Sequence, residues 1–234
     1  MPLPLVPIFI AFAVGAVVSG SVTSNWENIV YSLKGKKIAV LGARRVGKTT
    51  LFKYMEKGIL IKEYNQTRTQ DEIDRTRIKL GDLDILIKKT DDVSGAEKAY
   101  GVWEKLFKEA DLVLYIVRTD RLLDQDSATE KRSENDLKHI QSWIKELGAT
   151  EKKQFFIVGN HWDSDTRFKN LTPDTIGDYQ DKFTSLPIVE KITLLAGGSA
   201  KVKVALGSLA NKQDADNLIK EIDEDNNIAT LRFE

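Results

Sequence analysis

The sequence has 234 residues, with 35 basic and 35 acidic side chains and therefore no net charge. A balanced charge does not favour a nucleic acid as the main partner, because nucleic-acid-binding domains are usually basic. The chain has no cysteine, which excludes disulfides, thiolate zinc sites and thiol catalysis. Its two histidines, His139 and His161, leave little scope for a histidine-rich metal centre. The length fits one α/β domain with a short extension.

The first 23 residues form the most apolar part of the chain. The segment Leu3–Val22 carries no charged side chain, and about twenty residues at helical rise match a hydrocarbon thickness of about 30 Å. We therefore expect residues 1–23 to form one transmembrane helix, followed by a juxtamembrane linker over 24–36. Ala11, Gly15 and Ser19 recur every four residues, as in helices that pack closely. This spacing predicts a homodimer through the membrane helix.

The charges that follow the apolar segment predict its orientation. Lys34, Lys36 and Lys37 come directly after the short amphipathic stretch Asn25–Leu33, and positive flanking charge marks the cytoplasmic side. We therefore expect a single-pass membrane protein whose soluble domain faces the cytoplasm. Two alternatives stay open. A cleaved secretory signal normally begins with a basic residue, and none occurs before Lys34. A buried core helix can also be uniformly apolar.

The remainder of the chain alternates apolar runs with longer amphipathic runs, which is typical of an α/β domain with a mostly parallel sheet flanked by helices. We assign residues 37–225 to this domain and 226–234 to a tail. The expected strands are six: Lys37–Leu41, Arg77–Leu80, Leu83–Lys89, Leu112–Val117, Phe155–Val158 and Val202–Leu206. The expected helices are Thr49–Lys57, Tyr100–Glu109, Lys131–Leu147, Asp181–Leu195 and Gln213–Ile222. Gly81-Asp82 predicts a tight hairpin and hence one antiparallel edge strand.

The run from Gly42 to Thr49 has the pattern G-x-x-x-x-G-K-T between an apolar strand and an amphipathic helix. The glycines allow backbone N–H groups to surround phosphates, Lys48 reaches the β- and γ-phosphates, and the Thr49 hydroxyl binds Mg²⁺. The pattern and its context predict a P-loop. The residues expected to contact the nucleotide here are Gly42, Arg44, Arg45, Val46, Gly47, Lys48, Thr49 and Thr50.

Three further motifs decide between nucleotides, because ATPases and kinases also have P-loops. A D-x-x-G sequence runs from Asp92 to Gly95, after the third expected strand. The strand FFIVG leads into Asn160-His161-Trp162-Asp163, and the last strand leads into Gly207-Ser208-Leu209. Their order along the chain, from residue 42 to residue 209, resembles that of the Ras-like small GTPase superfamily.

This resemblance implies a P-loop GTPase fold that binds GTP or GDP with Mg²⁺. It implies that Asp163 accepts hydrogen bonds from guanine while Asn160 braces the P-loop. His161 stands where the family has a lysine and would cover the face of the base. The loop containing Ser208 and Leu209 would approach guanine O6. A membrane helix directly before such a domain is also similar in layout to the β-subunit of the signal recognition particle receptor.

The resemblance also implies the metal and switch residues. Thr49, Thr67 and Asp92 are the expected Mg²⁺ ligands, with Thr69 as the alternative to Thr67, and Gly95 is expected to sense the γ-phosphate. Thr67 lies in the polar run YNQTRTQDE, as expected of a mobile switch loop. Together with Lys48 and Arg45, Thr67 and Gly95 make up the expected catalytic set.

Two departures from the family pattern bear on hydrolysis. Ala96 stands where Ras-like enzymes usually have the glutamine that orients water, so we expect slow GTP hydrolysis. Arg44 and Arg45 occupy P-loop positions that are often small. Arg45 could act as an internal arginine finger, or both arginines could simply be solvated. We expect a GTP/GDP switch that an effector protein recognises. The alternatives are a nucleotide-bound membrane scaffold with little turnover and a P-loop ATPase.

Overall fold

The computed structural model describes residues 36–57, 75–80, 83–88, 96–148, 153–168, 175–198, 201–212, 214–219 and 222. Among these residues, no helix is both long and apolar enough to cross a bilayer. The expected membrane span over residues 1–23 lies outside them, as do most of the linker and the tail.

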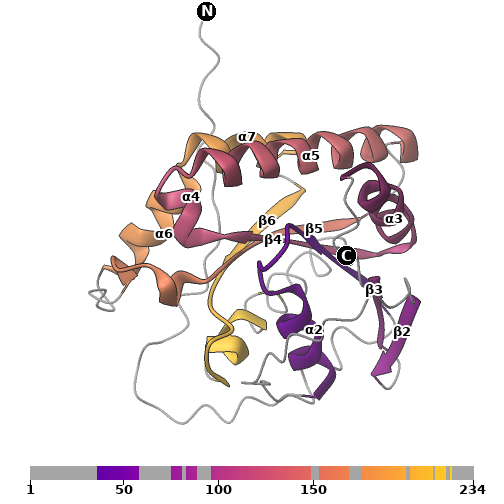
Figure 1. The fold of residues 1–234 in the computed structure, drawn as a ribbon, viewed down its shortest axis with the longest axis horizontal. Helices are drawn as coiled ribbons and strands as arrows, with labels where there is room; N and C mark the ends of the chain where they lie inside the picture. Colours follow the sequence, from indigo (N-terminus) through magenta and orange to yellow (C-terminus); the bar gives the residue numbers. More distant parts are fainter. Residues whose placement is uncertain are drawn as a thin grey trace, which may run out of the picture.

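Strands and helices alternate along the chain and build a sheet with helices on both faces (Figure 1). The strands are β1 (Lys37–Gly42), β2 (Arg75–Leu80), β3 (Leu83–Lys88), β4 (Leu112–Arg118), β5 (Gln154–Asn160) and β6 (Val202–Leu206). The helices are α2 (Lys48–Lys57), α3 (Ala96–Glu109), α4 (Thr119–Leu123), α5 (Ser127–Leu147), α6 (Ile176–Thr184) and α7 (Pro187–Leu195), with a short η1 turn at Trp162–Ser164. Residues 214–219 are also helical.

The sheet has six strands in the order β2-β3-β1-β4-β5-β6. β1 pairs in parallel with β3 and β4, and β4, β5 and β6 continue the parallel arrangement. β2 runs antiparallel to β3 at the edge, as expected from the hairpin signal between them. The carboxyl ends of the parallel strands therefore share one edge, which is where α/β proteins usually bind ligands.

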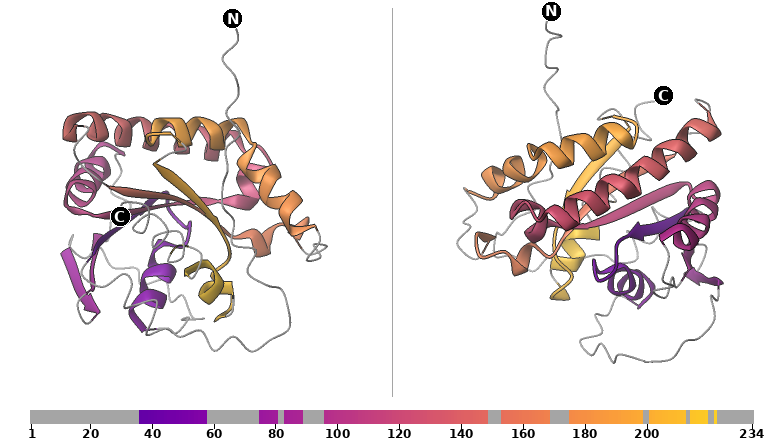
Figure 2. Two further views of the ribbon diagram at one scale, coloured as in Figure 1. Left: turned by 180° about the vertical axis from the view of Figure 1, so that it is seen from behind. Right: turned by 45° about the horizontal axis from the view of Figure 1, so that its top comes forward.

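Each face of the sheet contributes to its own hydrophobic core. Alternate residues of β1 point to opposite faces, so Ala39 and Leu41 join the core under α3, α5 and α7, while Ile38 and Val40 join the core with α2. The two further views show α5 and α7 side by side on one face, with α2 on the other (Figure 2). The central strands are buried on both faces, which explains their nearly continuous apolar sequences.

One expected helix, Asp181–Leu195, is instead two helices. α6 ends at Thr184, and α7 begins at Pro187. Proline lacks the N–H that would continue the helix, and its ring pushes the preceding residue out of helical geometry. Leu186 accordingly has φ −62° and ψ 131°. The sequence interpretation overlooked this break because the apolar spacing continues across it.

The expected helix Lys131–Leu147 begins earlier in the chain than predicted. The short helix α4 precedes it, and α5 begins at Ser127 rather than Lys131. Asp126 caps α5, because its side chain accepts hydrogen bonds from the Ala128 N–H at 3.2 Å and from the Thr129 hydroxyl at 2.7 Å. The cap explains why a helix can start in so polar a stretch.

Candidate functional site

The loop between β1 and α2 takes the conformation that its two glycines permit. Gly42 has φ +139° and Gly47 has φ +103°. A Cβ atom on Gly42 would lie 2.4 Å from the Ile116 carbonyl oxygen, and one on Gly47 would lie 2.3 Å from Asn160 Nδ2. Both positions therefore require glycine, because a side chain would be strained by the backbone and would clash with a neighbouring strand or loop.

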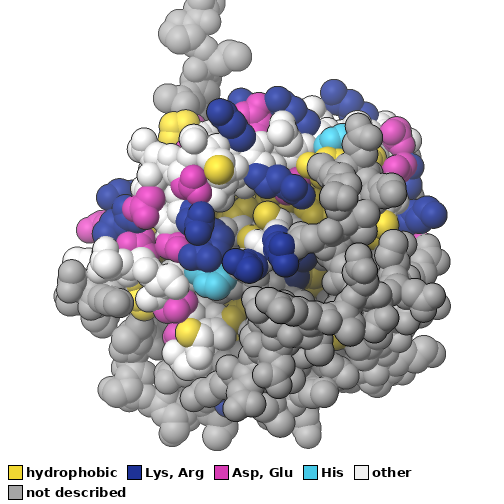
Figure 3. Space-filling view, viewed as in Figure 1, with side chains coloured by type: hydrophobic (Ala, Val, Ile, Leu, Met, Phe, Trp, Pro, Cys, Tyr) yellow, Lys and Arg dark blue, Asp and Glu magenta, His cyan; other side chains and the backbone are white. Residues whose placement is uncertain are grey.

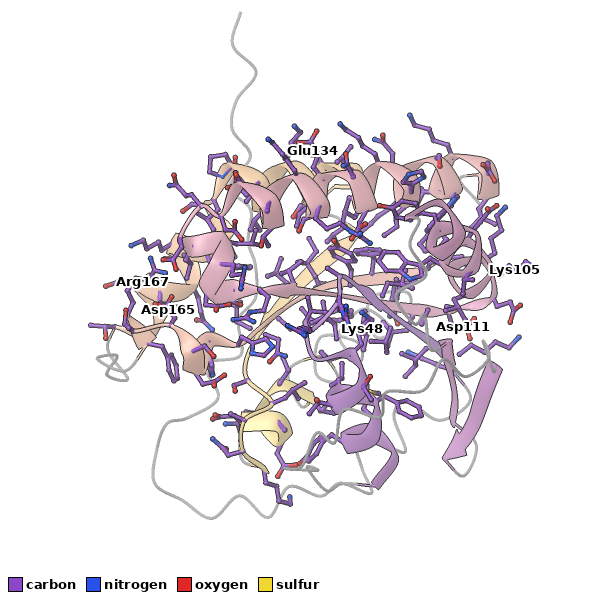
Figure 4. The ribbon with its side chains drawn as sticks, viewed as in Figure 1. Lys48, Lys105, Asp111, Glu134, Asp165 and Arg167 are labelled. Atoms are coloured by element: carbon purple, nitrogen blue, oxygen red, sulfur yellow. The ribbon has the colours of Figure 1, made fainter. Side chains whose placement is uncertain are left out.

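Lys48 lies at the first position of α2, where the loop meets the helix. Its Nζ donates hydrogen bonds to the carbonyls of Gly42, at 2.8 Å, and Ala43. Burial lowers the pKa of Lys48 to about 8, while Asp136 opposes the shift and Arg132 adds to it. In Figure 4 the labelled Lys48 lies between α2 and the strands. A cation that has lost most of its water is well suited to bind an anion.

The other loop residues divide by exposure. Val46 is buried and packs in the core under α2, whereas Arg44, Arg45 and Thr49 are exposed and Thr50 is half-buried. The Thr49 hydroxyl is thus available in the first turn of α2, beside Lys48. This placement fits a magnesium-bound phosphate, because hydroxyl oxygen is a suitable Mg²⁺ ligand and backbone N–H groups at a helix start favour anions.

Asn160 connects the end of β5 to the P-loop. Its side chain is buried, and Nδ2 donates to the Val46 carbonyl at 2.8 Å. Its Oδ1 has no hydrogen-bond partner among the described residues. This contact is the one that the bracing role implied by the resemblance requires.

Asp163 and Ser208 meet across the ends of β5 and β6. Ser208 Oγ donates to Asp163 Oδ1 at 2.5 Å and accepts from the Ala210 N–H at 3.0 Å. Gly207 N–H donates to the Gly159 carbonyl at 2.9 Å, which fixes the two loops together. Two sequence motifs that are 45 residues apart thus form one contact.

Leu209 extends this group of residues to the P-loop. A Cβ atom on Gly47 would lie 3.4 Å from Leu209 Cδ1. The predicted loops that follow β1, β5 and β6 are therefore neighbours at the carboxyl edge of the sheet. This proximity is what the order of motifs requires of a single nucleotide site.

His161 has a left-handed backbone, with φ 68°, just after β5. Its ring forms a hydrogen bond with the backbone of Arg45, and its Nε2 is buried without a partner among the described residues. Burial lowers the pKa of His161, and the charge of Arg118 lowers it further. The imidazole is therefore neutral at pH 7 and bridges the P-loop to the loop after β5.

Two charged residues at the end of β4 escaped the sequence analysis. Arg118 donates from Nε to Asp120 Oδ1 at 2.8 Å, and Nη2 bonds the other carboxylate oxygen. Burial disfavours the charged form of Asp120, but Arg118 outweighs it and holds the pKa of that carboxyl below its usual value. Arg118 pairs in register with Asn160 and acts electrostatically on Asp163. Arg118 directly follows the expected apolar strand Leu112–Val117, and this position is a sequence signal that could have identified it as a site residue.

A second ionic contact holds the segment that follows η1. Arg167 Nε lies 2.8 Å from Asp165 Oδ1, and Arg167 Nη2 lies 2.8 Å from Asp124 Oδ1. The Tyr179 hydroxyl donates to Asp165 Oδ2 at 2.9 Å. Figure 4 shows Asp165 and Arg167 together beside α6. These bonds fix the loop that carries Asp163 to α4 and α6.

Positive charge gathers over the P-loop side of the molecule. Figure 3 shows Lys and Arg side chains in a group beside a histidine near the middle of this face.

Three expected site residues, Thr67, Asp92 and Gly95, lie outside the described residues. Their predicted roles stay predictions.

Comparison with known families decides the class of this site. A family model described as "Ras of Complex, Roc, domain of DAPkinase" matches residues 37–163, more than half of the chain. The chain belongs to the Roc family of Ras-like P-loop GTPase domains. The match begins with β1 and ends at Asp163, so it includes the P-loop and the Asn160–Asp163 motif of this Roc domain. A comparison with curated protein sequences gives no match.

Solved structures share the fold of this Roc domain. One is the small COPII coat GTPase SAR1 from Encephalitozoon cuniculi in complex with GDP. It is 18% identical with a TM-score of 0.53, over 88% of this chain and 87% of that chain. Another is a dimerisation-deficient mutant of Toc33 from Arabidopsis thaliana, 15% identical with a TM-score of 0.55, over 86% and 91% of the two chains. At these identities the similarity concerns the fold alone.

Proposed function

We propose that this Roc domain binds GTP and GDP and acts as a membrane-tethered molecular switch. The observation that carries the proposal is the convergence of three loops. Asn160 bonds the P-loop at Val46, and Ser208 bonds Asp163 at the same edge of the sheet. A phosphate-binding loop beside a carboxylate of this kind gives a purine ring and its phosphates one continuous site.

Recognition of guanine rests on Asp163. A guanine base presents N1–H and an N2 amino group, which a carboxylate can accept together, whereas adenine lacks both donors. Ser208 already orients one carboxylate oxygen, and Arg118 supplies positive charge near Asp163. His161 would lie against the base in place of the family's lysine, while its bond to Arg45 keeps it near the P-loop.

The phosphate end rests on Lys48, Thr49 and the backbone of the P-loop. Mg²⁺, when bound with the nucleotide, neutralises phosphate charge and would be held by the Thr49 hydroxyl with Thr67 and Asp92. Lys48 would exchange its carbonyl partners for phosphate oxygens, which gives a buried ammonium a full opposite charge. In the switch proposal, the γ-phosphate orders the segments around Thr67 and Gly95, and hydrolysis releases them to change the surface that an effector protein binds.

Slow intrinsic hydrolysis is part of the proposal. α3 begins with Ala96, which has no side-chain group to orient water. Arg45 is exposed and has φ 61°, so a second copy of the chain could aim it at a phosphate without rearranging a packed side chain. Ala96 equally favours a second function, a nucleotide-bound scaffold with little turnover, and single-turnover hydrolysis separates the two. A P-loop ATPase is disfavoured by Asp163.

Membrane attachment through residues 1–23 is the remaining part of the proposal. Its support is the uncharged run of residues 3–22 and the lysines that follow it, because positive charge beside a membrane span favours the cytoplasmic side for the Roc domain.

The substitution Asp163→Asn tests the base assignment. We expect it to weaken GTP binding by about tenfold or more and to favour xanthosine triphosphate, whose carbonyl at position 2 needs a donor. Exposed Asp181→Asn on α6 is the matched control and should leave both affinities unchanged. Binding of GTP that survives Asp163→Asn, with no gain for the xanthine nucleotide, would exclude guanine recognition by Asp163.

A further inference from the structure

A buried carboxylate lies beneath the phosphate site. Asp136, on α5, has no exposed surface. It accepts hydrogen bonds from the Tyr100 hydroxyl of α3 at 2.7 Å, from the Tyr115 hydroxyl of β4 at 3.0 Å, and from Arg132 Nε at 2.8 Å. Burial raises the pKa of Asp136, although Arg132 and the two phenols favour its charged form. Three elements are thus joined at one side chain.

Arg132 uses only part of its hydrogen-bonding capacity in this cluster. Its Nε faces Asp136, and its guanidinium carbon lies 5.7 Å from the Tyr100 ring centre and 6.0 Å from that of Trp103. Its side chain is 39% exposed. Within the part of the chain that the structure describes, its two terminal nitrogens have no hydrogen-bond partner. Arg132 is therefore held in place by one edge while the other edge stays open to an anion.

The sheet register places the Asp136 cluster beside the strand that leads into the P-loop. Tyr115 pairs with Leu41, the residue before Gly42, whose carbonyl binds Lys48. The charge of Arg132 also acts directly on Lys48, where it lowers the pKa of the amine. Two cations that are close enough to oppose each other attract an anion between them.

The base end of the site lies at the opposite side. Asp163 and Ser208 follow β5 and β6, so a nucleotide extends from there across β4 toward β1 and β3. α3 packs beside β1 and β3, and Arg132 lies against Tyr100 and Trp103 of that helix. A nucleotide bound in this direction, with its first two phosphates in the P-loop, would extend its terminal phosphate toward the side on which α3 and Arg132 lie.

We propose that the open edge of the Arg132 guanidinium binds the terminal phosphate of a nucleoside triphosphate, and that Asp136 and the α3 aromatic rings pre-orient it. This inference rests on the nucleotide binding proposed above for the same P-loop. Arg132 then distinguishes triphosphate from diphosphate. Tyr100 of α3 and Arg132 bond to the same carboxylate, Asp136. Binding of that phosphate to Arg132 would therefore also affect the position of α3, the helix that directly follows the expected γ-phosphate-sensing segment.

The test compares two nucleotides on the full chain. Equilibrium binding of fluorescent GDP and of a fluorescent non-hydrolysable GTP analogue is measured with Mg²⁺ for wild type, Arg132→Gln and Arg132→Lys. Arg132→Gln removes a charge-assisted hydrogen bond, so we expect it to weaken binding of the GTP analogue roughly tenfold to a hundredfold. GDP affinity should change by less than about twofold, since GDP lacks the terminal phosphate. Arg132→Lys should restore part of the loss, because it keeps the charge without the fork.

Lys131→Gln is the matched control, because Lys131 is the exposed neighbour on the same helix and its loss changes the net charge equally. It should leave both affinities unchanged. Equal weakening of GDP and the GTP analogue by Arg132→Gln would assign Arg132 a structural role and overturn the inference, as would no weakening of either. A wild-type chain that binds neither nucleotide would overturn the proposed function along with it, so the two failures are distinguishable.

Discussion

Replacing Lys48 by methionine should stabilise the ligand-free protein. Burial lowers the pKa of Lys48 from 10.5 to about 8, and this difference corresponds to about 3 kcal/mol of unfolding free energy lost at pH 7. The hydrogen bonds from Nζ to the Gly42 and Ala43 carbonyls offset about 1 kcal/mol each. Methionine has a similar length and no charge. We therefore expect Lys48→Met to raise the unfolding free energy by about 1 kcal/mol.

The pH dependence gives the sharper form of this prediction. The folded-state pKa lies below the unfolded value, so the deficit of wild type relative to Lys48→Met is fully present below pH 8. It should shrink as the pH rises from about 8 through 10.5, because the folded state loses its proton at this amine first and the unfolded state then loses it too. Urea unfolding of both proteins between pH 7 and 9.5 measures this difference in unfolding free energy. Lys105→Met, at an exposed position on α3, is the matched control and should show no such convergence.

Nucleotide should reverse the order of stability. A ligand at about a hundred times its dissociation constant stabilises a folded protein by about 2.7 kcal/mol. We expect GDP to stabilise wild type and to leave Lys48→Met unchanged. The account treats Lys48 as a desolvated cation that destabilises the ligand-free protein and binds a phosphate. It would be refuted by a ligand-free Lys48→Met protein that is less stable than wild type at pH 7, or by a stability difference that does not vary between pH 7 and 9.5.

Two further predictions concern turnover and the membrane. GTP hydrolysis per molecule should be slow and should rise with protein density on liposomes, and Arg45→Ala should remove most of that rise while sparing GDP affinity. A rate independent of density would refute self-activation. A reporter fused after Glu234 should be cytoplasmic, and the chain should resist carbonate extraction unless residues 1–23 are deleted. Recovery of the full chain in the soluble fraction would contradict the anchor.

Apolar periodicity was sufficient to predict most of the fold. β1, β4, β5 and β6 lie within two residues of the expected ranges at each end, because strands buried on both faces read as continuous apolar runs. The turn residues between β2 and β3 correctly indicated an antiparallel pair. Failures occurred where another effect decided the structure. Pro187 divides α6 from α7 without interrupting the apolar spacing, and the Asp126 cap starts α5 within a charged stretch.

The candidate site divides in the same way. The sequence predicted the P-loop, Asn160, Asp163 and Ser208 as site residues because their chemistry fixes residue types at short spacings, and the structure brings these residues together. Arg118 and the Arg132–Asp136 pair were missed. Their arrangement depends on contacts between β4, α3 and α5, which no local pattern encodes. Charged residues that immediately follow an apolar strand are a signal that could have found Arg118.

Competition between GTP and ATP for the same site tests the central claim most directly. The full chain, loaded with fluorescent GDP in the presence of Mg²⁺, is titrated separately with each triphosphate. The account predicts displacement by GTP at least about a hundredfold more effectively than by ATP, because Asp163 would be left without its two donors by adenine. Equal displacement by ATP and GTP, or none by either, would contradict a guanine nucleotide site at this edge of the sheet.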